Sequence, residues 1–118
     1  MNLLQHFKAF IKQENLFSTK DRLLLAVSGG MDSAVLCELC QQGGFDFVIA
    51  HCNFQLRGAE SERDEAFVRA MAERYNKTVL VKRFETDSYA AQHKVSVQVA
   101  ARELRYAWFG ELVGSPHP

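Results

Sequence analysis

The residues best suited to chemistry lie in one short turn: Ser28, Gly29, Gly30, Met31, Asp32 and Ser33. Two glycines without Cβ atoms allow the backbone to turn sharply and to approach a ligand closely. A helix-compatible run follows, and its free N–H groups and positive dipole end would attract an anion into the turn. The serine hydroxyls add donors, and the Asp32 carboxylate could hold Mg²⁺ beside phosphate oxygens. The turn therefore indicates a cradle for nucleotide phosphates.

A Gly-Gly turn between a strand and a helix is also common in α/β proteins that bind no phosphate. Neither of two better-known phosphate motifs is present, because the chain has no Gly-x-x-x-x-Gly-Lys-Ser/Thr and no Gly-x-Gly-x-x-Gly after this strand. The pattern Ser-Gly-Gly-x-Asp-Ser instead resembles the loop of the PP-loop family, the ATP pyrophosphatases that cleave ATP to AMP and pyrophosphate. Every fixed position of that pattern is matched here.

The elements around the turn predict an α/β fold. An apolar run over 23–27 precedes the turn and is predicted as a buried, central parallel strand. The helix after the turn is predicted to end at Gly43-Gly44 and to be buried near the centre of the fold. Further strands are predicted at 46–52 and 78–84. Strand–helix alternation of this kind implies right-handed crossovers and a parallel sheet of at least three strands, open and Rossmann-like, with flanking helices.

The remaining helices are predicted from apolar spacing. Residues 3–11 show the pattern of an amphipathic helix packed on the sheet. Ser61 and Asp64 match a capping box for the helix after the second strand, whose buried face is predicted as Ala66, Phe67, Ala70 and Met71. Residues 85–94 are predicted as a loop or a short irregular helix. Ser96 is the predicted N-cap of a last helix, whose buried stripe is predicted as Val97, Ala100, Ala101, Leu104, Trp108 and Leu112.

Length and composition indicate a single domain over 1–118, with an N-terminal helix and connection in 1–20 and strand–helix repeats in 21–118. The formal net charge of +0 argues neither for nor against a nucleic-acid partner. The N-terminus has no signal-peptide pattern and no apolar run is long enough to span a membrane, so a cytoplasmic protein is expected. Cys37 and Cys40 fall inside a predicted helix and are interpreted as small buried side chains rather than a redox or metal site.

Further candidate residues follow the second strand. Ligands of open α/β sheets lie beyond the carboxyl ends of the strands, which would place His51, Cys52 and Asn53 beside the turn. A lone histidine at a strand end is more often a structural hydrogen-bonding group than a catalyst. Arg57 belongs to a glycine-containing loop next to the proposed phosphate site.

Two arginines on the last predicted helix, Arg102 and Arg105, are three positions apart and can therefore reach one surface patch. The alternative interpretation is a surface ion pair with Glu103 or a nearby aspartate.

Three further stretches, 51–58, 60–68 and 100–109, are similar to the tRNA(Ile)-lysidine synthetases, members of the PP-loop group with an adenine nucleotide alpha hydrolase-like domain. One departure is Phe54, where that family usually has a second histidine. Another is length, because the family's synthetase domain continues into a strand with a histidine and acidic cluster and then into tRNA-binding domains. We therefore expect a truncated, N-terminal part of such a protein, inactive by itself, with its lysine-binding residues beyond Pro118.

The resemblance implies a carbon–nitrogen ligase that uses ATP and Mg²⁺. ATP would adenylate the C2 carbonyl oxygen of the wobble cytidine in an isoleucine tRNA with a CAU anticodon, and the ε-amine of free lysine would displace AMP to give lysidine. It also implies roles for the candidate residues. The turn would hold pyrophosphate, Asp32 would hold Mg²⁺, and residues 50–53 would line the adenine or ribose. Arg102 and Arg105 would contact the α-phosphate or the adenylated intermediate.

Two other functions stay open at this point. One is a different PP-loop activity, tRNA thiolation or an amidotransferase synthetase; thiolation needs a catalytic cysteine outside the loop helix, and Cys52 is the candidate. The other is an adenine-nucleotide-binding module without catalysis. The sequence also leaves open a homodimer that would cover an exposed sheet edge.

Overall fold

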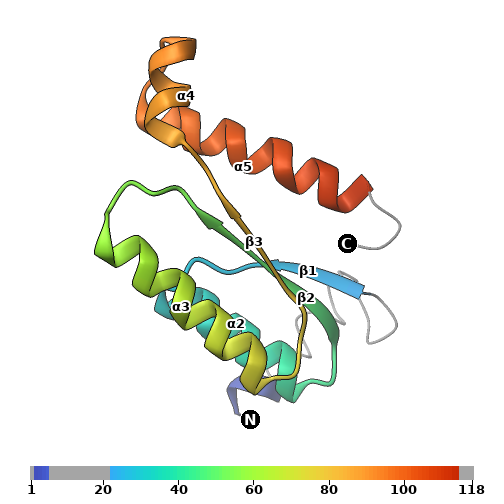
Figure 1. Ribbon diagram of the computed structural model, residues 1–118. Coiled ribbons are helices and arrows are strands. Elements are labelled where there is room, and N and C mark those ends of the chain that lie inside the picture. Colours follow the sequence, from blue (N-terminus) through green and yellow to red (C-terminus); the bar gives the residue numbers. More distant parts are fainter. Residues whose placement is uncertain (1, 6–21, 115–118) are drawn as a thin grey trace.

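The computed structural model describes residues 2–5 and 22–114, apart from the side chain of Asp32. Most of the predicted N-terminal helix therefore lies outside the described residues. Strands and helices alternate along the chain (Figure 1), as predicted. The elements are β1 (Arg22–Ala26), α2 (Met31–Gln42), β2 (Asp46–Asn53), α3 (Ala59–Arg74), β3 (Val79–Arg83), α4 (Thr86–His93) and α5 (Val97–Gly114). Among the helices of these residues, none combines the length and the apolar character that a membrane span requires.

The three described strands form an open parallel sheet in the order β1-β2-β3. Ala26 pairs with Ala50, and Asn53 pairs with Arg83, so the carboxyl ends of the strands share one edge. The prediction that 23–27 forms the central strand is wrong for this sheet, because β2 lies in the middle and β1 at one side. An apolar run indicates that both faces of a strand are covered. It does not indicate whether other strands pair with it on one edge or on both.

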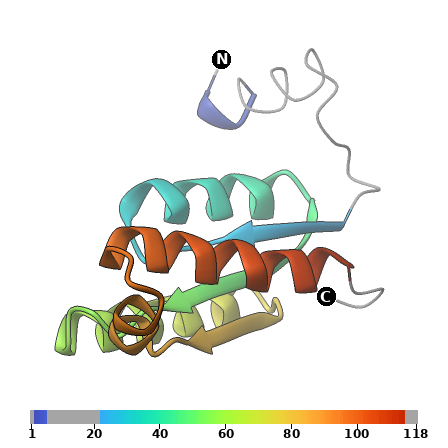
Figure 2. The ribbon, with the colours of Figure 1, turned by 90° about the horizontal axis from the view of Figure 1, so that it is seen from above.

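Helices cover both faces of the sheet: α2 and α3 pack on one face and α5 on the other (Figures 1 and 2). On the first face, Phe47 and Ile49 pack with the buried side chains of Cys37 and Met71. On the second face, the core contains Ala50, Phe84 and Trp108, with Leu24, Leu80 and Leu104 packed against it. Alternate residues of β2 thus serve opposite cores, as the two-residue period of a strand requires. The full burial of one large side chain of this kind contributes roughly 1.5–3 kcal/mol.

The structure corrects the prediction for α3. The helix begins at Ala59 with Gly58 as its N-cap, so Ser61 lies inside the first turn and no capping box forms. The Ser61 Oγ instead accepts a hydrogen bond from the Arg57 backbone N–H at 3.1 Å. Of the predicted buried face, only Met71 is buried; the face that packs inward is Glu65, Val68, Met71 and Ala72. The apolar pattern mispredicted the buried face of α3. Glu65 is buried among basic and amide partners, whereas the Phe67 side chain is 46% exposed.

The other helices follow the predictions more closely. Helix α2 ends at Gln42 with Gly43 as its C-cap, as predicted. Only one face of the helix is buried, because Val35 and Leu36 are exposed. Residues 86–93 form a regular helix, and its C-cap, Lys94, adopts the left-handed conformation. The Ser96 Oγ accepts the Val99 N–H at 3.1 Å, which confirms the predicted N-cap of α5.

Candidate functional site

The turn between β1 and α2 is closed by its own serine hydroxyls. The Ser28 N–H donates to Ser33 Oγ at 3.2 Å, and the Gly30 N–H donates to Ser28 Oγ at 3.2 Å. The two hydroxyl oxygens lie 3.1 Å apart, and Ser33 Oγ also donates to the Gly30 carbonyl at 3.2 Å. The hydroxyls therefore fix the shape of the loop, and the groups left to meet a ligand are mainly backbone N–H groups.

The start of α2 presents those N–H groups. Gly30 is the N-cap, no described side chain caps the helix, and the first helical bond of the backbone runs from the Ala34 N–H to the Gly30 carbonyl. The N–H groups of residues 31–33 thus precede the first helical bond, which is the arrangement of an anion site at a helix N-terminus. The Met31 side chain is 82% exposed, so Met31 could contribute to such a site through its backbone.

Helix α3 lies directly against the turn. Gly29 has φ +92°, and a Cβ at this position would come within 3.0 Å of Asp64 Cβ and 3.1 Å of its Cγ. A larger residue would therefore push α3 away from the turn. Sequence reasoning missed Asp64, because it assigned this residue to a capping box, and nothing local marks an acid that contacts a glycine at such a distance along the chain.

The end of β1 is held in place by β2. The Val27 N–H donates to the Ala50 carbonyl at 2.9 Å, and His51 Nδ1 donates to the Val27 carbonyl at 2.6 Å. His51 is 3% exposed. This hydrogen bond supports the prediction that His51 has a structural role, because it holds Val27 in place immediately before the turn.

Three open clefts meet at Ser28. The phosphate cleft has a volume of about 480 Å³, within the range of small-molecule sites, and is lined by Ser28, Gly30, Arg57, Glu60, Arg63 and Asp64. The strand-end cleft shares Ser28, Arg57 and Asp64 with it and is further lined by His51, Cys52, Asn53, Phe54, Leu56 and Ser61. The α5 cleft, on the other face of the sheet, is lined by Ala26, Val27, Ser28, Ala50, Cys52, Phe54, Arg105 and Phe109. The structure thus brings the predicted turn, strand end and Arg57 together.

The two predicted arginines of α5 differ in their surroundings. Arg105 lines the α5 cleft, and its guanidinium lies 5.4 Å from the centre of the Tyr106 ring. Arg102 is exposed and lines none of the three clefts at Ser28. The alternative of an ion pair with Glu103 is wrong, because Glu103 accepts the Tyr89 hydroxyl at 2.8 Å and neither arginine pairs with an acid in the described residues.

Arg57 contributes to both the phosphate cleft and the strand-end cleft. Its side chain is exposed and forms an ion pair with Glu60 in the first turn of α3. Since exposed pairs of this kind are weak, the guanidinium can exchange Glu60 for an incoming anion at little cost.

The cysteines are poorly suited to thiolate chemistry. Burial raises the pKa of the Cys37 thiol to about 11 and raises the pKa of Cys40. Burial also raises the pKa of Cys52 to about 11, although the nearby Arg105 opposes this shift.

The described residues contain no group of three or more His, Cys, Asp or Glu side chains that could hold a metal ion.

Phe54 brings no titratable group to the clefts. Its ring stacks on Phe84 with the centroids 5.5 Å apart, and Phe84 in turn contacts Trp108 edge-on. This aromatic cluster joins the end of β2 to α5, so residue 54 serves as an apolar wall of the clefts.

Comparison with known proteins gives a consistent picture. Residues 1–116 match the family described as the PP-loop domain. The chain is similar to the tRNA(Ile)-lysidine synthase of Bacteroides thetaiotaomicron, with 45% identity over 87% of this chain and 24% of the relative. It is also similar to those of Porphyromonas gingivalis strain W83, with 42% identity over 95% of this chain and 25% of the relative, and of Petrotoga mobilis, with 37% identity over 94% and 38%. The chain therefore spans about a quarter of the length of the first two relatives.

Proposed function

The chain belongs to the PP-loop family, and on that premise we propose that it binds ATP at the Ser28–Ser33 turn as the nucleotide-binding part of a tRNA(Ile)-lysidine synthase. The observation that carries the proposal is the uncapped start of α2 at the meeting point of three clefts. A phosphate chain fits this position, since backbone N–H groups and a helix dipole favour anions. The similarity to the named relatives supports the substrate assignment.

In the proposed reaction, the C2 carbonyl oxygen of a wobble cytidine attacks the α-phosphorus of ATP. The bond between the α-phosphorus and the bridging oxygen breaks, and pyrophosphate leaves with the electron pair. The ε-amine of lysine then attacks C2, loses a proton and displaces AMP, which leaves lysidine at the wobble position of an isoleucine tRNA with a CAU anticodon. The first step builds negative charge on pyrophosphate, which pre-oriented donors stabilise most effectively.

The chain's own residues have distinct proposed roles. The backbone N–H groups at Gly30 and the start of α2 bind the leaving pyrophosphate, and the Ser28 and Ser33 hydroxyls keep the loop in shape. Arg57 adds positive charge from the edge of the phosphate cleft. The end of β2, including His51 and Asn53, borders the adenine or ribose.

The remaining polar residues extend these roles to the α-phosphate and the metal. Arg105, which lines the α5 cleft, contacts the α-phosphate or the adenylated intermediate. Arg102, which lines none of the three clefts, contacts the adenylated intermediate once the tRNA is bound. Asp32 would hold Mg²⁺, which would supply Lewis-acid stabilisation of phosphate charge, since a carboxylate suits this ion. Asp64 places a carboxylate at the phosphate cleft.

The experiment that tests the proposal uses the full-length protein with isoleucine tRNA and lysine. We expect the exchange of labelled pyrophosphate into ATP and the formation of lysidine, both abolished by Asp32→Ala while the far-ultraviolet circular dichroism is unchanged. ATP binding without pyrophosphate exchange would instead indicate a non-catalytic nucleotide-binding module.

A second variant separates ligation from thiolation. The raised pKa of Cys52 keeps this thiol protonated near neutral pH, so Cys52→Ser should leave lysidine formation intact. Loss of product in Cys52→Ser, with thiolated tRNA formed by the unaltered protein, would overturn the ligase assignment.

A further inference from the structure

One buried acid is not used by the proposed chemistry. Glu65 of α3 is 4% exposed and faces the carboxyl ends of β2 and β3, whereas the neighbouring acids Glu60 and Glu62 are exposed. Burial of a carboxylate is costly unless the charge is paired and hydrogen-bonded. The surroundings of Glu65 meet that requirement with an unusually complete set of partners.

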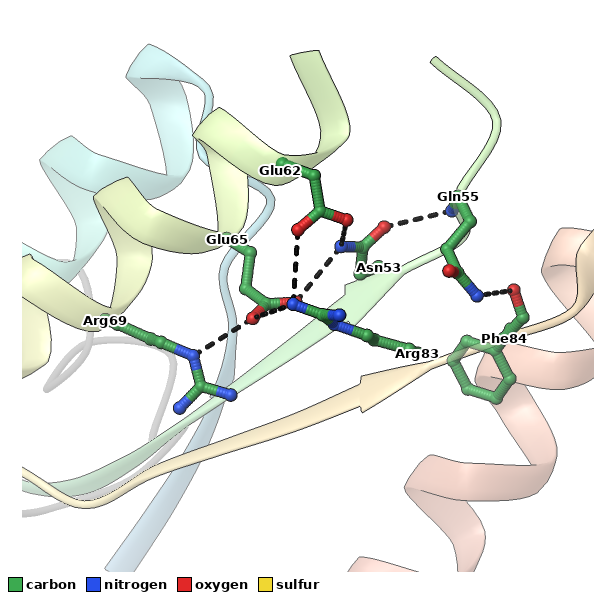
Figure 3. A network of polar contacts seen from close by, with 7 residues as sticks. All are labelled: Asn53, Gln55, Glu62, Glu65, Arg69, Arg83 and Phe84. Carbon is green, nitrogen blue, oxygen red and sulfur yellow. Dashed lines mark hydrogen bonds and ion pairs between the residues drawn. The ribbon is translucent and has the colours of Figure 1, made fainter. Parts of the chain in front are cut away.

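Those partners come from three elements (Figure 3). Arg83 of β3 donates from Nε to Glu65 Oε1 at 3.0 Å and from Nη2 to Oε2 at 3.1 Å, which makes a bidentate pair. Arg69, one turn further along α3, donates from Nε to Oε2 at 3.1 Å. From β2, Asn53 Nδ2 donates to Oε1 at 3.0 Å. Because Asn53 and Arg83 are register partners in the sheet, Glu65 ties α3 to both strand ends at once.

The contact with Glu65 decides how the Asn53 amide is oriented. Its NH₂ group faces the carboxylates of Glu65 and, at 3.4 Å, Glu62, so its Oδ1 is turned toward the chain that leaves β2. There Oδ1 accepts the Gln55 N–H at 3.0 Å. The opposite orientation would place Oδ1 against two carboxylates and would offer the Gln55 N–H a second donor instead of an acceptor.

Gln55 in turn sets the path of the loop over 54–58. It adopts the left-handed conformation, with φ 55°, and its Nε2 donates to the Phe84 carbonyl at 2.9 Å. Two residues later the same loop carries Arg57 into the phosphate cleft, and at Gly58 it enters α3. The orientation of one buried amide is thereby linked to the position of a cation at the candidate site.

We infer that Glu65 is a positioning residue of the nucleotide site, which holds Arg57 at the phosphate cleft by fixing the Asn53 amide and through it the 54–58 loop. The inference rests on the proposed nucleotide binding for its functional consequence. Exposed or half-exposed ion pairs add little stability, and buried ones are often matched by apolar replacements. The contribution of this network is therefore to select one loop conformation.

The test compares ATP affinity, measured by calorimetry on the full chain, in five variants. Glu65→Gln should weaken affinity about tenfold, the loss expected for one misplaced charge-assisted contact. In an Arg57→Ala background, Glu65→Gln should cause no further loss, because it acts through Arg57. Asn53→Ala should reproduce the loss without removing the Glu65–Arg83 pair. Glu73→Gln, at an exposed position of the same helix, is the matched control and should keep the affinity of the unaltered chain. Equal affinity losses in the presence and absence of Arg57 would overturn the inference.

Hydrogen exchange separates the two proposals. If Glu65 positions the loop, the Gln55 amide should exchange faster in Glu65→Gln than in the unaltered chain, whether or not ATP binds. An unaltered chain that fails to bind ATP, but shows this faster exchange, would refute nucleotide binding and leave the positioning role standing. A Gln55 amide that is equally protected in both proteins would refute the positioning role.

Discussion

Gly29 of the turn lies directly against Asp64 of α3, since a Cβ at Gly29 would lie 3.0 Å from Asp64 Cβ. Gly29 is thus required twice, once for its φ of +92° and once for the space that α3 occupies. This contact shapes the phosphate cleft. Because α3 packs against the turn, the first residues of α3 line the cleft together with Ser28.

Gly29→Ala should therefore damage both stability and binding. We expect the free energy of unfolding to fall by about 1–3 kcal/mol, the range for a strained backbone conformation, and ATP binding to be lost because α3 must shift. Chemical denaturation and calorimetry measure the two effects. Gly44→Ala is the control, since Gly44 has φ +75° with nothing within 4 Å; it should destabilise the chain and leave ATP affinity unchanged. Equal binding by both variants would contradict the role of the Asp64 contact.

Ser33→Ala should open the turn. It removes the oxygen that accepts the Ser28 N–H and donates to the Gly30 carbonyl, so we expect ATP affinity to fall at least about tenfold through loss of loop shape. Ser96→Ala is the matched serine control at the N-cap of α5. It should lower the free energy of unfolding by about 1 kcal/mol without changing affinity. An unchanged affinity in Ser33→Ala would show that its hydroxyl does not shape the site.

Arg105→Ala and Arg102→Ala should differ in their effect on nucleotide binding. Arg105 borders the α5 cleft beside Ser28, whereas Arg102 lies away from all three clefts. We expect Arg105→Ala to weaken ATP affinity by calorimetry and Arg102→Ala to leave it nearly unchanged, any effect of the latter being confined to the tRNA-dependent steps of the full-length protein. The reverse order of effects would mean that α5 is turned differently when ATP is bound.

The Glu65 network should give stability a specific dependence on pH. The hydrogen bond from Arg83 lowers the pKa of Glu65 from 4.5 to about 2 against the opposing effect of burial, with Asn53 and Arg69 assisting. Because the folded-state pKa is depressed, the ionised carboxylate stabilises the fold above about pH 4.5, and this contribution is lost as the pH falls toward 2.

Urea denaturation between pH 2 and pH 7 measures that loss. Glu65→Gln should flatten the acid limb of the stability curve. The charged groups around this position stay in place: Arg83 and Arg69, which contact Glu65, and Glu62, which pairs with Arg83. Identical slopes in the two proteins would show that folding does not lower the pKa of Glu65.

The sequence alone determined the features that depend on local chemistry. Glycines at a strand–helix junction favour a sharp turn with free N–H groups, and short apolar runs bounded by turn residues favour strands. Ser96 caps α5 because a hydroxyl before a helix satisfies a nearby N–H. The parallel sheet, the succession of strands and helices along the chain and the family resemblance were therefore predictable from the sequence.

Tertiary structure decided what depends on residues far apart in the chain. Whether β1 or β2 is central depends on pairing, which a strand's own composition does not encode. Glu65 can turn inward because Arg83, eighteen positions away, neutralises it, and Asp64 borders the turn because α3 packs against Gly29. Likewise the packing of α5 on the sheet brings Arg105, and not Arg102, to the α5 cleft beside Ser28. Pairing, burial and charge compensation are properties of contacts across space, so they are settled only when the chain has folded.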